Sequence, residues 1–329
     1  MIRTAVIGVG YLGRFHAQKY AQMEEVDLVG VVDISPERAQ DVASEVGTRA
    51  YTDIHEIVGK IDAASVVVPT IHHHEVAKIL LSHGIHCMLE KPISTTLEEA
   101  DELISLAKEQ SLILQVGHLE RFNPAIKVLE AKVKRPLFIE AHRLSGFKDR
   151  ATDVDVVLDL MIHDLEIILA MVDSPLKEIR AVGVPVLTPK VDIANTRLIF
   201  ENGCTANLTA SRISLQDMRR IRVFQPGAYI SADCAACKSL VVTRDLSAGP
   251  MAAIRPEFKT HEGTDMLYDE LESFVRAVKG IEKPKVTGES GRRALKLAMD
   301  INARIMQGLN TSDLGSIIRN IEFEVPKVS

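Results

Sequence analysis

The stretch Gly8-Val9-Gly10-Tyr11-Leu12-Gly13 decides the fold of the first half of the chain. It follows a β-branched run, Thr4–Gly8, and opens a segment of helical spacing, Tyr11–Gln22. Asp33 stands at the end of the next strand-like run, about 20 residues after the last glycine. A GxGxxG spacing between a strand and a helix, with an acidic residue at this distance, predicts a turn that binds the pyrophosphate of a dinucleotide.

The three glycines and the aspartate have separate purposes in such a turn. Gly8 permits the tight turn, Gly10 lets the backbone approach the pyrophosphate, and Gly13 lets helix and strand pack closely. The Asp33 carboxylate would accept hydrogen bonds from the adenosine ribose and repel a 2′-phosphate, so NAD is favoured over NADP. The alternative for Asp33 is an aspartate that only forms a turn.

Outward from this turn, residues 2–117 alternate short apolar runs with longer segments of helical spacing. The pattern predicts a parallel, doubly wound sheet with crossover helices, that is, a Rossmann domain. The predicted strands are Thr4–Gly8, Leu28–Asp33, Ala64–Val68, His86–Glu90 and Ile113–Val116. The predicted helices are Tyr11–Gln22, Pro36–Val46, His73–Ser82 and Leu97–Glu109.

The pattern changes after Gly117. Strand-like runs then follow one another with only short turns between them, so the second sheet must be mostly antiparallel. The strand-like runs include Leu137–Arg143, Ile179–Val186, Asn195–Phe200, Ala206–Ser211 and Ile221–Phe224. The predicted helices are Pro124–Lys134, Val156–Val172, Asp265–Lys279 and Ser290–Gln307.

We therefore expect an α/β protein of two domains. Residues 1–118 form the NAD(P)-binding Rossmann domain, and residues 119–329 form a substrate-binding α/β domain with a mostly antiparallel open sheet. An open sheet would expose a large face, so the second domain should also mediate oligomerisation into a homodimer or homotetramer.

Composition and charge exclude several classes of protein. Of 329 residues, 46% are hydrophobic and 26% charged, as in an ordinary globular protein. The formal charge of −6 offers no basic field for nucleic acid. No signal peptide and no run of roughly 20 apolar residues are evident, so we expect a cytoplasmic protein that does not enter a membrane. Its four cysteines should be free thiols.

Glu90-Lys91-Pro92 follows a predicted strand, at the edge of an open α/β sheet where ligands bind. A lysine there can reach a cofactor, and the proline restricts its backbone to extended geometry and allows a cis bond. Position alone leaves open whether Lys91 acts on a ligand or is a solvated turn residue.

Asp159 and His163 are four residues apart in an apolar predicted helix, so their side chains share one face. Polar groups on so apolar a helix either pair in the core or border a wet cleft. A histidine with a carboxylate one turn earlier is typical of an oriented general base, and we favour that function over a core pair.

The sequence predicts no metal site. Adjacent side chains at a helix start point in different directions, so His72, His73 and His74 suit tetrahedral ligation poorly. Cys234 and Cys237 have the spacing of half a zinc site, but no second pair accompanies them. The basic run Arg219–Arg222 is most simply a solvated strand face, with phosphate binding as the alternative.

These motifs together resemble the glucose-fructose oxidoreductase and inositol 2-dehydrogenase (Gfo/Idh/MocA) family. The residues that carry the resemblance are GVGYLG with Asp33, Pro69 with His73, Glu90-Lys91-Pro92, GHLERFNPA at Gly117–Ala125 and DxxxHD at Asp159–Asp164. Asp269–Phe274 and Thr287–Gly291 are similar to the family's closing helices, so the resemblance covers essentially the whole chain.

The resemblance implies hydride transfer between NAD(P) and a hydroxyl carbon of a sugar, cyclitol or nucleotide sugar. It makes Lys91 the catalytic or substrate-orienting lysine, His163 the acid or base and Asp159 a ligand of substrate hydroxyls, with Pro92 cis. The cofactor-binding residues that it implies are Gly8, Gly10, Tyr11, Leu12, Gly13, Asp33, Pro69, His73, Glu90, Lys91 and Pro92. Further substrate residues would be Arg121, Asn123, Arg143 and Arg150.

Three departures concern the substrate. Met161 occupies a usual glycine position, Thr70 stands where asparagine is usual, and Asp153-Val-Asp-Val-Val replaces a stretch often rich in glycine. They leave Lys91 and His163 intact but reshape the wall near the nicotinamide, so the substrate cannot be copied from the family's best-known sugars.

Within the family, GHLERFNPA, EAHRLSGF and DVVLDLMIHD look most like members that oxidise UDP-N-acetylglucosamine at position 3. Arg143, Arg150 and the Arg219–Arg222 run would be available for a pyrophosphate. The alternatives are a free-sugar or inositol dehydrogenase and a non-enzymatic protein that senses a dinucleotide. Retention of Lys91 and of the Asp159 and His163 pair argues against the sensor.

Overall fold

The structure is a computed structural model of the chain and describes residues 1–147, 154–244 and 254–311. The chain forms two compact units. The first comprises Met1–Phe122 and Asp265–Arg293, and the second comprises Asn123–Thr264 and the chain from Ala294 onward. The first unit is thus larger than the expected range 1–118, because a late segment of the chain returns to it.

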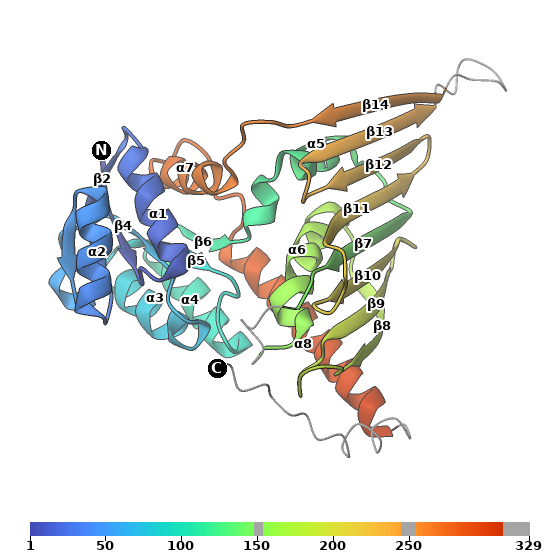
Figure 1. Ribbon diagram of the computed structural model, residues 1–329, viewed down its shortest axis with the longest axis horizontal. Helices are drawn as coiled ribbons and strands as arrows, with labels where there is room; N and C mark the ends of the chain where they lie inside the picture. Colours follow the sequence, from blue (N-terminus) through green and yellow to red (C-terminus); the bar gives the residue numbers. More distant parts are fainter. Residues whose placement is uncertain (148–153, 245–253, 312–329) are drawn as a thin grey trace. The chain divides into compact units, whose positions relative to one another are not determined.

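The first unit contains a six-stranded parallel sheet in the order β3-β2-β1-β4-β5-β6, drawn in blue to green in Figure 1. The strands are β1 (Ile2–Ile7), β2 (Val26–Val32), β3 (Arg49–Tyr51), β4 (Ala63–Val66), β5 (His86–Glu90) and β6 (Leu114–Gly117). The predicted parallel sheet is confirmed. Strand order reverses between β1 and β4, and open α/β sheets bind ligands beside the carboxyl ends of the strands at such a point.

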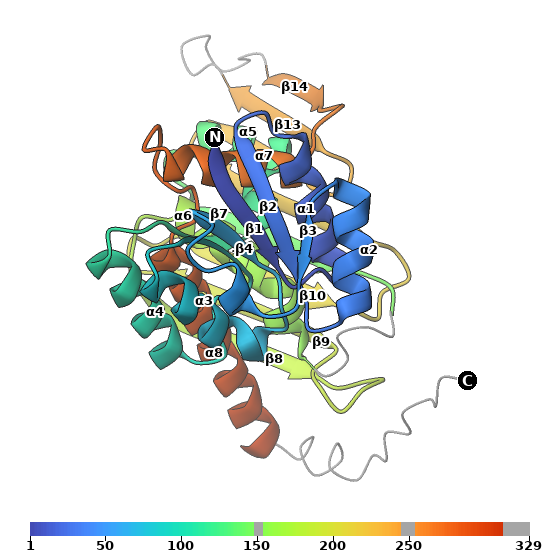
Figure 2. The same ribbon diagram turned by 90° about the vertical axis from the view of Figure 1, so that its left-hand side faces the viewer.

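Helices cover both faces of this sheet, and Figure 2 shows α1 and α2 on one side of β1 and β2, with α3 and α4 on the other. The helices are α1 (Tyr11–Gln22), α2 (Pro36–Val46), α3 (His73–Ser82), α4 (Leu97–Glu109) and α7 (Met266–Val278), with 3₁₀ turns η1 (Ile54–Glu56), η2 (Thr70–His72) and η3 (Leu119–Phe122). The start of α2 follows from its sequence, because the Ser35 hydroxyl accepts from the Arg38 N–H and Pro36 occupies the first turn.

Helix α7 explains why residues 265–293 belong to the first unit. It buries Leu271, Phe274 and Val275 in the core that also holds Tyr20 and Met88. Each large apolar side chain that is fully buried contributes about 1.5–3 kcal/mol, so this helix is part of the hydrophobic core of the Rossmann unit.

The second unit contains an eight-stranded sheet in the order β14-β13-β12-β11-β7-β10-β9-β8. Neighbouring strands are antiparallel except β7 and β10, which are parallel, so the predicted mostly antiparallel sheet is confirmed. The strands are β7 (Phe138–Leu144), β8 (Leu176–Val184), β9 (Ile193–Phe200), β10 (Thr205–Ser211), β11 (Met218–Gln225), β12 (Ala228–Asp233), β13 (Lys238–Arg244) and β14 (Ile254–Thr260).

The core of the second unit lies between this sheet and its helices. The helices are α5 (Pro124–Lys132), the π-helix η4 (Val157–Met161), α6 (Ile162–Met171) and α8 (Gly288–Thr311), of which Ala294 onward belongs to this unit. None of the helices in the described ranges is long and apolar enough to cross a membrane.

The predicted helix Val156–Val172 differs from the observed one in its first turn. Residues Val157–Met161 form a π-helix, in which the Ile162 N–H reaches back to the Val157 carbonyl oxygen, and an α-helix follows. The prediction of one continuous α-helix was therefore wrong at this end. Single π-turns within α-helices are rare and frequently lie at functional sites.

Candidate functional site

The glycines of the first turn have the geometry that their spacing predicted. Gly8 has φ +85°, and a Cβ there would lie 2.7 Å from the Val67 carbonyl oxygen. A Cβ on Gly13 would lie 1.9 Å from the Gly8 carbonyl oxygen, so the start of α1 can approach β1 only with glycine at this position. A Cβ on Gly10 would meet nothing within 4 Å, so the space beside this residue is open to a ligand.

Helix α1 begins at this turn, and no side chain of the turn satisfies or neutralises the N–H groups at its N-terminus. Gly10 is the N-cap, no side chain caps the first turn, and no acidic residue lies in it. Because the first N–H groups of a helix lack intrahelical partners and carry partial positive charge, this end suits a phosphate. The backbone around Gly10 therefore fits the pyrophosphate of a dinucleotide.

A pocket of about 940 Å³ in the first unit extends from this turn to the end of β5. That volume lies within the range of about 300–1,000 Å³ typical of cofactor and ligand sites. Of the predicted cofactor residues, those that line it are Gly8, Gly10, Tyr11, Leu12, Asp33, Pro69, His73, Glu90 and Lys91. Gly13 and Pro92 are not among the lining residues. Gly13 instead allows α1 to approach Gly8, and Pro92 forms the cis peptide bond after Lys91.

Asp33 both faces this pocket and holds the turn. Its Oδ2 accepts the Val9 N–H at 3.0 Å and its Oδ1 accepts the Ser35 N–H at 3.0 Å. Arg38 Nη1 lies 3.2 Å from Oδ1 and 3.3 Å from Oδ2, and the half-exposed Arg38 side chain is also among the lining residues of the pocket. The sequence had not singled out Arg38, because only the position of α2 brings its first turn beside the carboxylate.

The turn after β5 is fixed by its own residues. The Lys91–Pro92 peptide bond is cis, as the family resemblance implied. The Glu90 carboxylate accepts the Lys91 N–H at 3.2 Å and lies 3.3 Å from His16 Nε2. A Cβ on Gly117 would lie 2.9 Å from the Glu90 carboxyl carbon, so glycine in β6 makes room for this carboxylate.

His73 connects two segments of the pocket wall and is 1% exposed. Its Nδ1 lies 2.8 Å from the Pro92 carbonyl oxygen and its Nε2 lies 2.9 Å from the Val68 carbonyl oxygen. Burial, opposed by these two contacts, lowers the pKa of His73, so the ring is neutral and donates to one carbonyl at a time. The described contacts of His73 therefore connect the backbone at Val68 and at Pro92 on two sides of the pocket wall.

Two buried residues beside Lys91 and Glu90 were missed by the sequence analysis. Burial, together with the positive charges of Lys91 and Arg121, lowers the pKa of His118 to about 3, so this histidine is neutral. Burial and the Glu90 charge raise the pKa of Glu270 well above its ordinary value, and neither of its carboxyl oxygens has a hydrogen-bond partner within the described ranges. The position of His118, directly after β6, could have identified it.

In the second unit, Asp159 lies in the π-helix η4 and His163 in the first turn of α6. Both are half-buried, whereas their neighbours Ile162 and Asp164 are buried. A core pair would be excluded from solvent, so this partial exposure favours the functional interpretation of the two side chains.

Two predicted substrate residues make contacts that hold the second unit together. Arg143 on β7 is 4% exposed, and its Nη2 and Nε lie 2.7 and 3.2 Å from the Asp164 carboxylate. Asn123 caps α5 by accepting the Ala125 N–H at 3.0 Å and donates to the Cys234 carbonyl oxygen at 3.0 Å. Their assignment to substrate binding remains a prediction.

The other predicted substrate arginines lie in different environments. Arg121 is half-buried in η3, and Arg150 lies outside the described residues. In β11, Arg220 pairs with Asp233 at 2.8 Å and Arg222 pairs with Glu140 at 2.7 Å. These ion pairs agree with a solvated strand face.

Cys234 and Cys237 are free thiols, as are the other two cysteines. Within residues 1–147, 154–244 and 254–311, no three His, Cys, Asp or Glu side chains gather in a way that could hold a metal ion.

Comparisons with known proteins agree with the geometry of the glycine turn. The family model described as an oxidoreductase family with an NAD-binding Rossmann fold matches residues 2–118. UDP-N-acetylglucosamine 3-dehydrogenase of Acidithiobacillus ferrooxidans is 40% identical over 306 residues, which are 92% of this chain and 97% of that protein. A solved structure of the enzyme of this name from that organism gives a TM-score of 0.87, with 39% identity over 93% of this chain and 98% of the other.

A second curated relative acts on a cyclitol according to its name. Myo-inositol 2-dehydrogenase of Thermotoga maritima is 27% identical over 315 residues, which are 90% of this chain and 94% of that protein. The similarity to both relatives thus extends through both compact units.

Proposed function

Because the chain belongs to the oxidoreductase family with an NAD-binding Rossmann fold, the Gfo/Idh/MocA family, we propose that it oxidises UDP-N-acetylglucosamine at a sugar hydroxyl with NAD. Homologues along most of the chain are dehydrogenases, and the chain is accordingly an enzyme of the CH–OH dehydrogenase class. The observation that carries the proposal is the pocket that extends from Gly10 and Asp33 to Lys91, because it links a pyrophosphate cradle to a lysine that can act on substrate.

Two observations favour a nucleotide sugar over a free sugar or inositol. The identity of 40% to a UDP-N-acetylglucosamine dehydrogenase clearly exceeds the 27% to an inositol dehydrogenase. The half-buried Arg121 of η3 is a cation whose charge, like that of Lys91, acts on His118, and it could bind a substrate phosphate, which inositol lacks. A sensor that only binds the dinucleotide would have no use for Lys91 in the pocket wall.

NAD, when bound, supplies the hydride acceptor. We propose that His163 removes the proton of the substrate hydroxyl and that the Lys91 ammonium stabilises the negative charge that develops on its oxygen. Asp159 binds a neighbouring hydroxyl and orients the sugar. The cis turn, the Glu90 carboxylate and His73 fix the backbone at Lys91 before substrate binds. Less entropy is then lost when the lysine is positioned at the substrate.

A ligand panel tests the substrate. UDP-N-acetylglucosamine in the presence of NAD should raise the melting temperature and form NADH with a 3-keto product, whereas myo-inositol and free N-acetylglucosamine should do neither. A ligand that binds only the native state at 100 times its Kd stabilises it by about 2.7 kcal/mol. Stabilisation and NADH formation with myo-inositol alone would replace the proposed substrate with a cyclitol.

The cofactor preference should depend on the charge of Asp33. We expect wild type to prefer NAD in kcat/KM, and Asp33→Asn to reduce that preference, since asparagine retains hydrogen bonding but no longer repels a 2′-phosphate. Arg38→Met removes the cation beside Asp33 but keeps the carboxylate, so it should not reduce the preference for NAD. A wild-type preference for NADP of tenfold, about 1.4 kcal/mol, would contradict the assignment.

We also propose that the enzyme is a homodimer or homotetramer. The core helices of the second unit pack against the inward-facing residues of its sheet, while outward-facing residues such as Phe138, Phe224 and Tyr229 form a partly exposed aromatic cluster. Such a cluster on a sheet is suited to cover by a second copy of the chain.

A further inference from the structure

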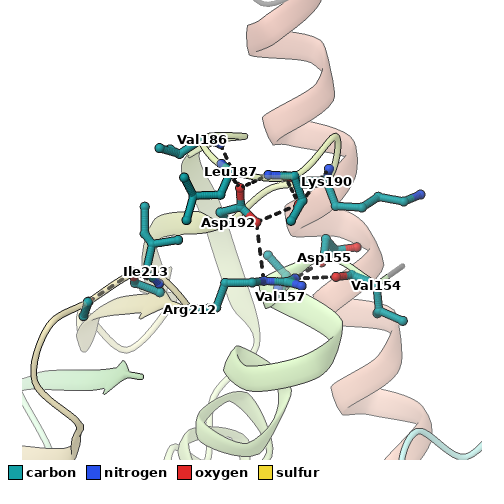
Figure 3. A network of polar contacts seen from close by, with 12 residues as sticks. Val154, Asp155, Val157, Val186, Leu187, Lys190, Asp192, Arg212 and Ile213 are labelled. Carbon is teal, nitrogen blue, oxygen red and sulfur yellow. Dashed lines mark hydrogen bonds and ion pairs between the residues drawn. The ribbon is translucent and has the colours of Figure 1, made fainter. Parts of the chain in front are cut away.

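Asp192 and Arg212 form a buried pair where two strands of the second unit meet, shown in Figure 3. Asp192 directly precedes β9 and Arg212 directly follows β10. The two strands pair up to Ser211 and Ile193, and the Arg212 N–H donates to the Asp192 carbonyl oxygen at 3.0 Å. The sheet therefore fixes the backbone of both residues.

The Asp192 carboxylate organises the loop that precedes it. The residue is 0% exposed. Its Oδ2 accepts the N–H groups of Val186, Leu187 and Thr188 at 2.8, 2.7 and 2.8 Å. Burial opposes the charged form, but these hydrogen bonds outweigh it and hold the pKa of Asp192 below its ordinary value. A charged carboxylate thus lies in the core of the unit.

The Arg212 guanidinium connects this carboxylate to a different segment. Its side chain is 6% exposed, and Nε lies 3.6 Å from Asp192 Oδ1. Nη2 donates to the Val154 carbonyl oxygen, three residues before the π-helix η4. Figure 3 shows the side chain of Arg212 extended between Asp192 and Val154.

Asp155, the residue after Val154, is hydrogen-bonded to the start of the helical segment that contains the proposed catalytic side chains. Asp155 Oδ1 accepts the N–H groups of Val157 and Leu158 at 2.9 and 3.0 Å, which caps η4. Asp155 Oδ2 accepts the Asn302 side-chain amide of α8 at 2.9 Å.

The π-turn is also tied to the sheet through its own backbone. The Val156 N–H donates to the Val191 carbonyl oxygen at 3.0 Å, beside Asp192. The Asp159 N–H donates to the Asp155 carbonyl oxygen at 3.0 Å. Any displacement of the segment at Val154 and Asp155 therefore moves Asp159, and His163 one turn later, relative to the sheet.

We propose that Arg212, held by Asp192, is a positioning residue that sets Asp159 and His163 at the substrate by fixing Val154 at the start of the π-helix. The inference rests on the proposed function of these two side chains. The inference also gives the rare π-helix η4 a function. Asp159 lies within η4, so its position depends on where this π-helix begins. Displacement of a catalytic group by about 1 Å can cost about 10²-fold in rate.

The test compares Arg212→Met, Arg212→Lys and Asp192→Asn with Ile230→Ala. Ile230 on β12 is 0% exposed in the same core, and β11 and β7 separate its strand from β10, so its truncation is a control for lost stability alone. Measurements are made on full-length enzyme well below the melting temperature of each variant. They comprise kcat per folded protein, the pH profile of kcat, NAD affinity and amide hydrogen exchange of residues 155–163.

Arg212→Met should lower kcat at least tenfold, change the pH profile and accelerate exchange in residues 155–163, with NAD affinity within twofold. Arg212→Lys should recover part of kcat, because a lysine can still donate to the Val154 carbonyl. Ile230→Ala should lower the melting temperature without these changes. If Arg212→Met does not fold, Arg212→Lys and Asp192→Asn provide the same comparison.

Equal stability loss in Arg212→Met and Ile230→Ala with kcat retained within twofold would reduce the pair to a purely structural role. Unchanged exchange in residues 155–163 would likewise overturn the proposal. A wild-type enzyme that oxidises none of the sugars offered is a different result: it defeats the proposed function, and hydrogen exchange then decides alone whether Arg212 fixes the helix.

Discussion

Replacement of His163 with alanine should lower kcat by about 10²- to 10⁴-fold, because general acid or base catalysis contributes that much to a proton transfer. NAD affinity should stay within about twofold, since the pocket that fits NAD is lined by residues of the first unit. Steady-state kinetics with UDP-N-acetylglucosamine and fluorescence titration with NADH measure the two effects separately.

The matched control for His163 is His74→Ala. His74 is a largely buried histidine of α3 whose Nε2 lies 2.7 Å from Glu102, away from the pocket lining. It should retain wild-type kcat. If His163→Ala also kept kcat within about twofold, the proton would have to leave through another group, and the assignment of His163 would be wrong.

Lys91→Ala should lower kcat by about 10²- to 10³-fold and raise the KM for the sugar together, since in the proposed mechanism the lysine both stabilises the developing oxyanion and orients the hydroxyl. Lys78→Ala is the control, because Lys78 pairs with Glu102 at 2.6 Å on the surface of the same unit. Initial rates over a range of sugar concentrations separate the two parameters.

The double variant Lys91→Ala, His163→Ala shows whether the two residues act on one step. Groups that act as a unit are strongly non-additive, so the double variant should be little slower than the slower single variant. Losses that multiply would instead assign the residues to independent steps and contradict the joint mechanism.

The sequence could predict the Rossmann unit because its signal is local. A glycine turn is defined by six residues, and its spacing, strand and helix are adjacent in the chain, so Gly8 and Gly13 have the predicted geometry. Strand β3 was not predicted, because three residues carry no period. Strand β14 was not predicted either: all its residues are exposed, so it has no alternation between core and solvent.

The contacts that the sequence could not predict are those between distant segments. Arg38 contacts Asp33 across a turn, Glu270 comes close enough to Glu90 to feel its charge although it lies near the far end of the chain, and Arg212, just after β10, contacts Val154. Each depends on tertiary packing rather than on periodicity. The π-turn belongs to the same class, because apolar spacing alone does not distinguish it from α-helix.

Helix α7 has a consequence for biosynthesis. Its apolar side chains complete the nucleotide-binding core, yet they are encoded after the whole of β7–β14. When residues 1–122 have been synthesised but α7 has not, the apolar side chains around Tyr20 and Met88 therefore lack their cover. Domains generally mature in order of synthesis, and transiently exposed apolar surface aggregates. We therefore expect this apolar surface to stay exposed until Phe274 leaves the exit tunnel, and an isolated fragment that ends at Phe122 to expose it permanently.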